Sequence, residues 1–106
     1  MPIRVALATA AILAAVPALA AQLGTIRPDV TTIGCADRGD ARQAEELRTK
    51  LGISAALAFS VPRGCVSLLP EQTVTVIEQH ADAMSLVVPK GQTRRVWVPR
   101  DGVSIR

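Results

Sequence analysis

The sequence predicts an α+β domain: a short N-terminal helical region, tied by a disulfide to a small antiparallel β-meander or barrel. Residues 40–60 have helical periodicity, whereas residues 65–106 have strand-like alternation interrupted by Pro and Gly turns. Helical patterns that come before strand patterns, rather than alternating with them, are typical of an α+β plan. The third observation is a cysteine on each side of the helical region, Cys35 and Cys65.

The first twenty residues have the layout of a cleavable secretory signal peptide. Arg4 supplies a positive start, a mostly apolar run follows over residues 5–16, and Ala18 and Ala20 place small residues where a signal peptidase reads them. An uncleaved membrane anchor needs about 20 strongly apolar residues, and this run is rich in alanine instead. We therefore expect cleavage after Ala20, a periplasmic or secreted bacterial protein, and no membrane attachment afterwards.

Cleavage leaves enough chain for one domain and no more. We expect residues 21–34 to form an extended leader, because Pro28 excludes a helix there, and its β-branched residues 30–33 could add a short strand. Residues 35–106 are expected to form the single small domain. Phe59 and Trp97 are the only aromatic residues of the chain. A core this small is marginally stable without covalent support.

Cys35 and Cys65 supply that support. In an exported protein they form the only possible intramolecular pair, and their spacing is unlike the C-x-x-C of a redox centre. No second Cys/His pair completes a zinc site. A structural disulfide is therefore expected, with an intermolecular bridge as the alternative. Closing a loop of this length stabilises a chain by about 3–4 kcal/mol on the chain-entropy model.

One helix is predicted to begin with Asp40 as its N-cap, with Gln43 completing a capping-box variant. Gly52 is a suitable residue to end it. A second helical turn over residues 54–60 is predicted to bring Leu57 and Phe59 towards the core. The apolar face of the first helix consists of residues at helical spacing: Ala41, Ala44, Leu47 and Leu51.

The last third of the chain is predicted to form an antiparallel meander. Alternating or β-branched runs are separated by turn sequences at Pro89-Lys90-Gly91-Gln92 and Asp101-Gly102. The expected strands cover residues 73–78, 84–88, 93–98 and 103–105.

From about residue 64 onward, the chain carries a series of landmarks in this order: Leu69-Pro70-Glu71-Gln72-Thr73, Val74-Thr75-Val76, Leu86-Val87, Gly91 and Trp97-Val98. In this order they resemble bacterial Src-homology-three-like domains of exported proteins. This resemblance implies a small β-barrel that binds peptides or cell-wall material. Three departures from the family pattern stand out: Gln72 replaces a turn glycine, Arg95-Val96 precedes Trp97 where a glycine is usual, and the central strand lacks an aromatic residue.

The charge of the chain is unevenly distributed. Of the whole-chain net charge of +3, residues 84–106 carry +4. A basic end attracts anionic partners, although charges on strand edges also serve to prevent aggregation. Trp97, with Arg94 and Arg95 beside it, is the candidate partner contact, because Trp and Arg anchor interfaces. The alternative for Trp97 is burial in a core poor in aromatics.

The only histidine gives the one candidate for chemistry. Glu78, His80 and Asp82 alternate along the chain and would share a face of an extended segment. No further His or free Cys completes a metal shell, and a loop between strands explains their polarity without catalysis. No phosphate-binding glycine loop or aromatic platform for nucleic acid is present. We therefore expect neither enzymatic activity nor a cofactor nor nucleic-acid binding.

The functional prediction is a non-catalytic periplasmic domain that binds a protein or a cell-wall component. An accessory or inhibitor subunit of a periplasmic enzyme is the first alternative. A metal-dependent activity centred on His80 is the second. The sequence leaves the partner and the oligomeric state open.

Overall fold

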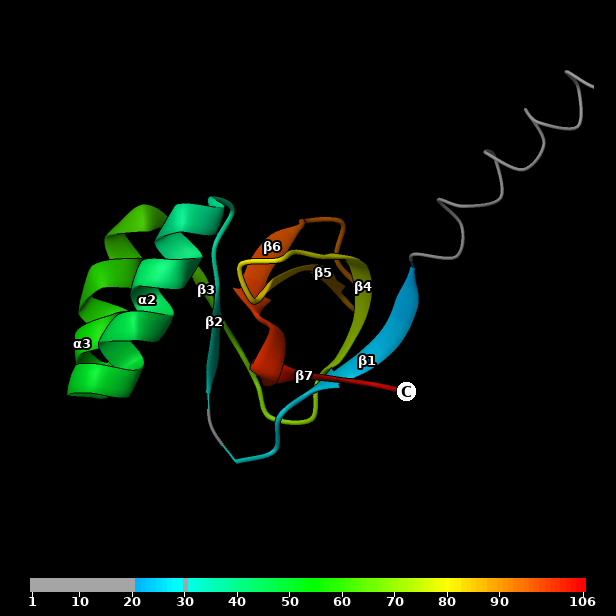
Figure 1. Ribbon diagram of the computed structural model, residues 1–106, viewed down its shortest axis with the longest axis horizontal. Coiled ribbons are helices and arrows are strands. Elements are labelled where there is room, and N and C mark those ends of the chain that lie inside the picture. The colour runs from blue at the N-terminus through cyan, green and yellow to red at the C-terminus, as the bar shows by residue number, and fades with distance from the viewer. Residues whose placement is uncertain (1–20, 30) are drawn as a thin grey trace, which may run out of the picture.

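The computed structural model describes residues 21–29 and 31–106. A curled antiparallel sheet forms a half-barrel, and two helices cover one side of it (Figure 1). The α+β class and its disulfide are therefore confirmed. The expected signal peptide, residues 1–20, lies outside the described residues.

The main sheet has five strands in the order β6-β5-β4-β1-β7, with every neighbouring pair antiparallel. A separate two-stranded sheet joins β2 to β3. Short 3-10 helices follow α3 and β6. The strands are β1 Gln22–Ile26, β2 Thr32–Gly34, β3 Val66–Leu68, β4 Thr73–Gln79, β5 Met84–Pro89, β6 Val96–Pro99 and β7 Val103–Ile105; the 3-10 helices are η1 Val61–Arg63 and η2 Arg100–Gly102.

The order of elements differs from the prediction in one respect. The helical region is not N-terminal, because β1 and β2 both precede it. β1 lies inside the main sheet, paired with β4 on one side and with β7 on the other. The segment expected to be an extended leader therefore supplies a central strand. The pairing brings the two ends of the described chain together, and Arg106 donates its backbone N–H to the carbonyl of Leu23 at 3.0 Å.

The helices are α2, Arg38–Leu51, and α3, Ile53–Ser60. The N-cap of α2 is Asp37 rather than Asp40: the Asp37 side chain accepts a hydrogen bond from the backbone N–H of Asp40 at 3.1 Å. Gly52 ends α2 as predicted, with its N–H donated to the carbonyls of the last turn. Its φ of 101° lies in the region that favours glycine.

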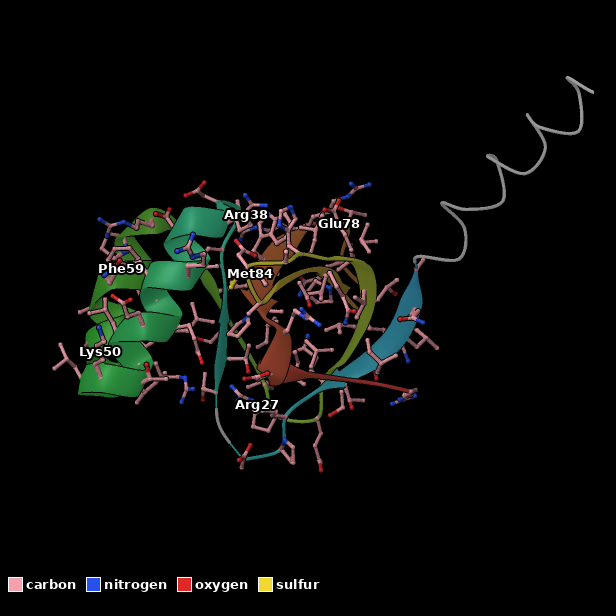
Figure 2. The ribbon with its side chains drawn as sticks, in the orientation of Figure 1. Arg27, Arg38, Lys50, Phe59, Glu78 and Met84 are labelled. Atoms are coloured by element: carbon pink, nitrogen blue, oxygen red, sulfur yellow. A yellow bond between two sulfur atoms is a disulfide. The ribbon has the colours of Figure 1, made fainter. Side chains whose placement is uncertain are left out.

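The apolar residues form two clusters. The first fills the concave side of the curled sheet with seven buried residues: Ile26, Leu68, Val74, Val76, Val87, Val96 and Val98. The second lies between the helices and the sheet and includes Met84 (Figure 2), with Ala41 and Ala44 from α2. Leu51, expected on the apolar face of α2, is instead 71 % exposed, because it falls on the last turn beyond the reach of the sheet.

The disulfide between Cys35 and Cys65 is present, as predicted. It joins the end of β2 to the residue before β3. Cys35 also pairs with Trp97 on β6 through two backbone hydrogen bonds of 3.1 and 2.7 Å. The bridge therefore holds the two helices and the β2–β3 sheet together, next to β6, the edge strand of the main sheet.

Candidate functional site

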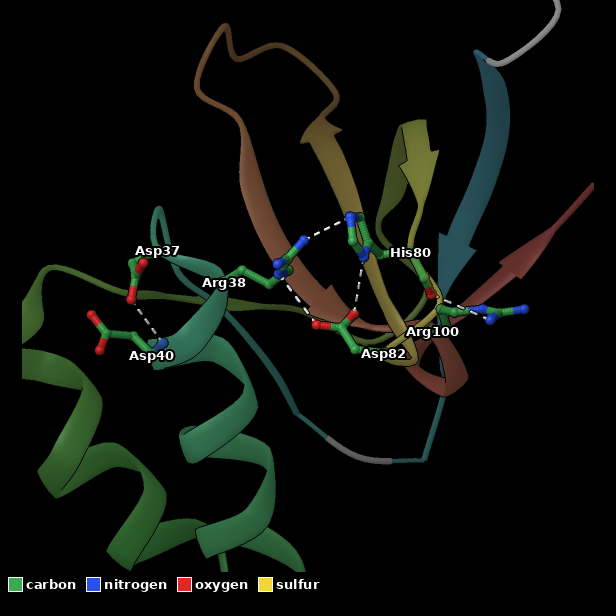
Figure 3. Close-up of polar contacts among 6 residues, drawn as sticks. All are labelled: Asp37, Arg38, Asp40, His80, Asp82 and Arg100. Carbon is green, nitrogen blue, oxygen red and sulfur yellow. Dashed lines mark hydrogen bonds and ion pairs between the residues drawn. The ribbon is translucent and has the colours of Figure 1, made fainter.

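The most connected group of polar side chains surrounds His80. Arg38, at the start of α2, donates a hydrogen bond from Nη1 to His80 Nε2 at 2.7 Å, and its Nε lies 3.2 Å from Asp82 Oδ2 (Figure 3). His80 Nδ1 is 3.7 Å from Asp82 Oδ1. We call Arg38, His80 and Asp82 the Arg38 cluster. It fastens the first turn of α2 to the connection between β4 and β5.

The backbone of that connection holds His80 and Asp82 in place. The N–H of His80 donates to the carbonyl of Met84 at 2.7 Å, which closes a tight turn. Ala83 takes a positive φ of 67°, which is uncommon for a residue with a side chain. Arg100 steadies the same turn from η2, because its backbone N–H donates to the carbonyl of Ala83 at 2.9 Å.

The geometry of the Arg38 cluster disfavours metal chemistry. A metal ligand must offer a lone pair, yet the Nε2 lone pair of His80 already accepts from a guanidinium. The same cation lies beside Asp82, where it would repel a divalent ion. Glu78 is exposed on β4 and takes no part in the cluster. In residues 21–29 and 31–106, no group of three or more His, Cys, Asp or Glu side chains is placed to hold a metal ion.

Trp97 lies between the layers rather than on an open face. Its half-buried ring packs against the cluster of apolar residues under the helices. The guanidinium of Arg38 sits 5.4 Å from the centre of the ring, and His80 meets it edge-on at 5.9 Å between ring centroids. Trp97 thus anchors the Arg38 cluster to β6, and much of its surface is occupied from within the chain.

Arg94 and Arg95, the other two predicted contact residues, do not lie on a strand. Both belong to the connection before β6, so Arg95 does not share a strand face with Trp97. Residues 90–95 are all exposed and contain Lys90, Arg94 and Arg95 with no acidic residue. We call this segment the basic loop. Arg94 fastens it to the neighbourhood of the disulfide, because its Nη2 donates to the carbonyl of Gly64 at 2.5 Å.

A groove of about 410 Å³ lies on the outer side of the main sheet, next to the basic loop. We call it the sheet groove. Its floor comes from β1, β4 and β5, and its wall from the start of the basic loop. The two charged residues that line it, Lys90 and Arg106, are both basic. Other lining residues are Leu23, Thr73, Thr75 and Val88.

The sequence identified some of these residues and missed others. His80, Asp82, Trp97, Arg94 and Arg95 were singled out, but Arg38 was not. Its role depends on where the helix lies, and the predicted helix began at Asp40, so that Arg38 fell just before it. The groove residue Leu23 was missed because the strand that carries it was expected to be a leader.

Comparisons with known proteins give no relative. No family model matches the chain, and neither a curated protein nor a solved structure matches it. Among the described residues, no helix is long and apolar enough to cross a membrane.

Proposed function

We propose that the chain is an exported, non-catalytic module that binds an anionic partner, either a protein or a cell-wall component, through its basic loop. One observation carries the proposal. Six consecutive residues, 90–95, are all exposed and carry three cations and no acid. Clustered cations raise the local concentration of an anionic partner and speed its association.

Export is supported by the disulfide. A Cys35–Cys65 bridge persists in an oxidising compartment and is rare in the reducing cytosol. The signal-like first twenty residues lead to the same proposal. We infer a periplasmic or secreted location, with the domain released from the membrane after cleavage.

We also propose that the β-region is a small barrel of the Src-homology-three-like kind. The strand order supports this, because β4, β5 and β6 form a meander, η2 follows, and β7 returns to pair with β1. The helices are then an insertion between β1 and the meander. Binding through a loop on a rigid β scaffold is a common use of such domains.

Binding is a better proposal than catalysis because the candidate chemical group is already engaged. Arg38 contacts His80 Nε2 and Asp82 Oδ2, so the cation already engages one atom of each candidate side chain. With the Arg38 cluster set aside as a catalytic site, the exposed cations of the basic loop are the remaining candidate for function.

The test is binding to two anionic probes, immobilised polyglutamate and isolated cell-wall material. We expect the oxidised protein to bind at least one of them at about 10 mM salt and to release it near 1 M. Replacing Lys90, Arg94 and Arg95 together with Gln is expected to weaken binding about tenfold or more.

The matched control replaces three exposed cations elsewhere: Arg42→Gln, Lys50→Gln and Arg100→Gln. It has the same net charge as the loop variant and is expected to retain most of the binding. Equal losses in the two variants would show that net charge alone attracts the probe. No binding to either probe at low salt would end the proposal.

A further inference from the structure

We propose that the sheet groove receives an acidic segment of a partner protein, with one aliphatic side chain of that segment seated against Leu23 and Val88 and its carboxylates beside Lys90 and Arg106. This rests on the proposed anion-binding function and names the partner's class. The two candidate partners, a protein and a cell-wall polymer, are distinguished by the floor of the groove.

The floor is a row of two aliphatic side chains with a threonine between them, on the sheet face opposite the core. Leu23 on β1 pairs with Thr75 on β4, and Thr75 pairs with Val88 on β5, so the three side chains lie side by side on one face. Val76 and Val87 occupy the opposite face, inside the core. Leu23 is 54 % exposed, which leaves a large apolar surface facing water.

The rim of the groove has one sign of charge. Lys90 and Arg106 are the charged groups that line it, and the rest of the basic loop continues from Lys90. A partner segment must therefore be anionic, since an approaching cation would be repelled from both sides. Leu23 and Val88 on the floor then favour a chain that also carries an aliphatic side chain, as an acidic peptide can. An acidic polysaccharide has no such group to bury.

The mode of contact follows from the position of the floor strands. β1, β4 and β5 each have a neighbour on both sides, so their backbone groups are already paired in the sheet. A partner cannot add a strand here and must bind by its side chains. A space of about 410 Å³ matches one buried side chain with part of the adjoining backbone.

The experiment uses two blocked peptides, one with a leucine between two pairs of glutamates and one with a serine in its place. The protein is produced by export and used in its oxidised form, and binding is followed by chemical-shift titration at low salt. We expect the leucine peptide to bind about fivefold more tightly, because burying part of one leucine contributes about 1 kcal/mol. Lys90→Gln combined with Arg106→Gln should weaken both peptides.

The decisive variant is Leu23→Ser. It should abolish the preference for leucine while leaving the serine peptide unaffected. Leu69→Ser is the matched control, because Leu69 is also exposed, at 68 %, and does not line the groove. That control should keep the fivefold preference.

Failure takes forms that distinguish the two proposals. Equal binding of the two peptides, or a preference that survives Leu23→Ser, overturns the groove assignment but leaves an anion-binding loop in place. Binding of cell-wall material alone, with no peptide bound, does the same. Self-association that Leu23→Ser removes would assign the groove to a second copy of the chain and would also overturn the inference. Absence of every salt-sensitive interaction would overturn both proposals.

Discussion

Gly34 lies where β2 closely approaches β6. It ends β2 immediately before the Cys35–Trp97 backbone pair, and a Cβ placed on it would lie 2.7 Å from Cγ2 of Val96. Val96 is fully buried and has no room to move away. Gly34→Ala is therefore expected to lower the free energy of unfolding by about 1–3 kcal/mol, measured by urea denaturation.

Gly39→Ala is the control for that substitution. A Cβ at Gly39 would meet only the end of the Asp37 side chain, at 3.3 Å. Since Gly39 also lies within α2, alanine there is expected to be neutral or stabilising. A Gly34→Ala protein as stable as the original would mean that β2 does not approach β6 as closely as the structure places it.

A second prediction concerns Arg38, whose side chain contacts His80, Asp82 and Trp97. Arg38→Met keeps the aliphatic stem but removes the donors to His80 and Asp82, leaving a half-buried carboxylate without its cation. We expect a loss of about 1–2 kcal/mol of unfolding free energy. Arg42→Met, one turn further along α2 and exposed, should change it by less than about 0.5 kcal/mol. Equal effects of the two substitutions would show that the Arg38 cluster contributes no more to stability than an ordinary exposed side chain.

The roles of single residues could be predicted where they follow from neighbouring residues in the sequence or from composition. The disulfide needed only a count of two cysteines, and Gly52 needed only the rule for helix ends. Arg38 and Gly34 could not be found in this way. Their roles depend on residues 42 and 62 positions further along the chain, His80 and Val96, which only the tertiary structure brings close.

At the scale of one element, the N-terminus of α2 allows the assignment of the helix cap to be tested. Asp37 caps the helix by accepting from the N–H of Asp40, and helix N-caps contribute about 0.5–2 kcal/mol. Asp37→Ala should therefore destabilise the protein by that amount in thermal or urea unfolding. Asp37→Asn should restore most of it, because asparagine caps about as well as aspartate. A larger loss from Asp40→Ala than from Asp37→Ala would contradict this assignment of the cap.

The same helix shows why the ends of elements were harder to predict than their presence. Both Asp37 and Asp40 satisfy the cap preference, and the sequence alone gives no reason to prefer the earlier one. Glu46 and Lys50, which lie one turn apart on the same helix, form an ion pair at 3.8 Å. The strand over residues 73–79 was also located well, because its burial alternates along the chain. The strand over residues 84–89 is buried at nearly every position, and its β-branched and apolar run bounded by a Pro-Gly turn was enough to locate it.

At the scale of the molecule, the predictions of an α+β class and of an antiparallel meander are confirmed for β4, β5 and β6, but the place of the first strand was not predicted. β1 was not recognised because its sequence, Gln-Leu-Gly-Thr-Ile, contains a glycine and directly follows the proposed cleavage site. That glycine is required: a Cβ at Gly24 would lie 2.9 Å from the carbonyl oxygen of Ser104 and from Cγ1 of Val103 on β7. Glycine has a low intrinsic preference for strands, but at position 24 its lack of a side chain permits the close pairing of β1 with β7.

The stability of the whole molecule also depends on its disulfide. The two apolar clusters are small, and the bridge between Cys35 and Cys65 closes a loop that contains both helices. Replacing both cysteines with alanine should lower the free energy of unfolding by about 3–4 kcal/mol, a large share of what a domain of this size has. Alanine avoids burying a hydroxyl at Cys35, which is 1 % exposed. The unmodified protein with its disulfide reduced should then unfold at nearly the same urea concentration as the double variant. If reduction leaves its stability unchanged, the packing of helices on sheet is sufficient by itself, and the link is not needed to hold the layers together.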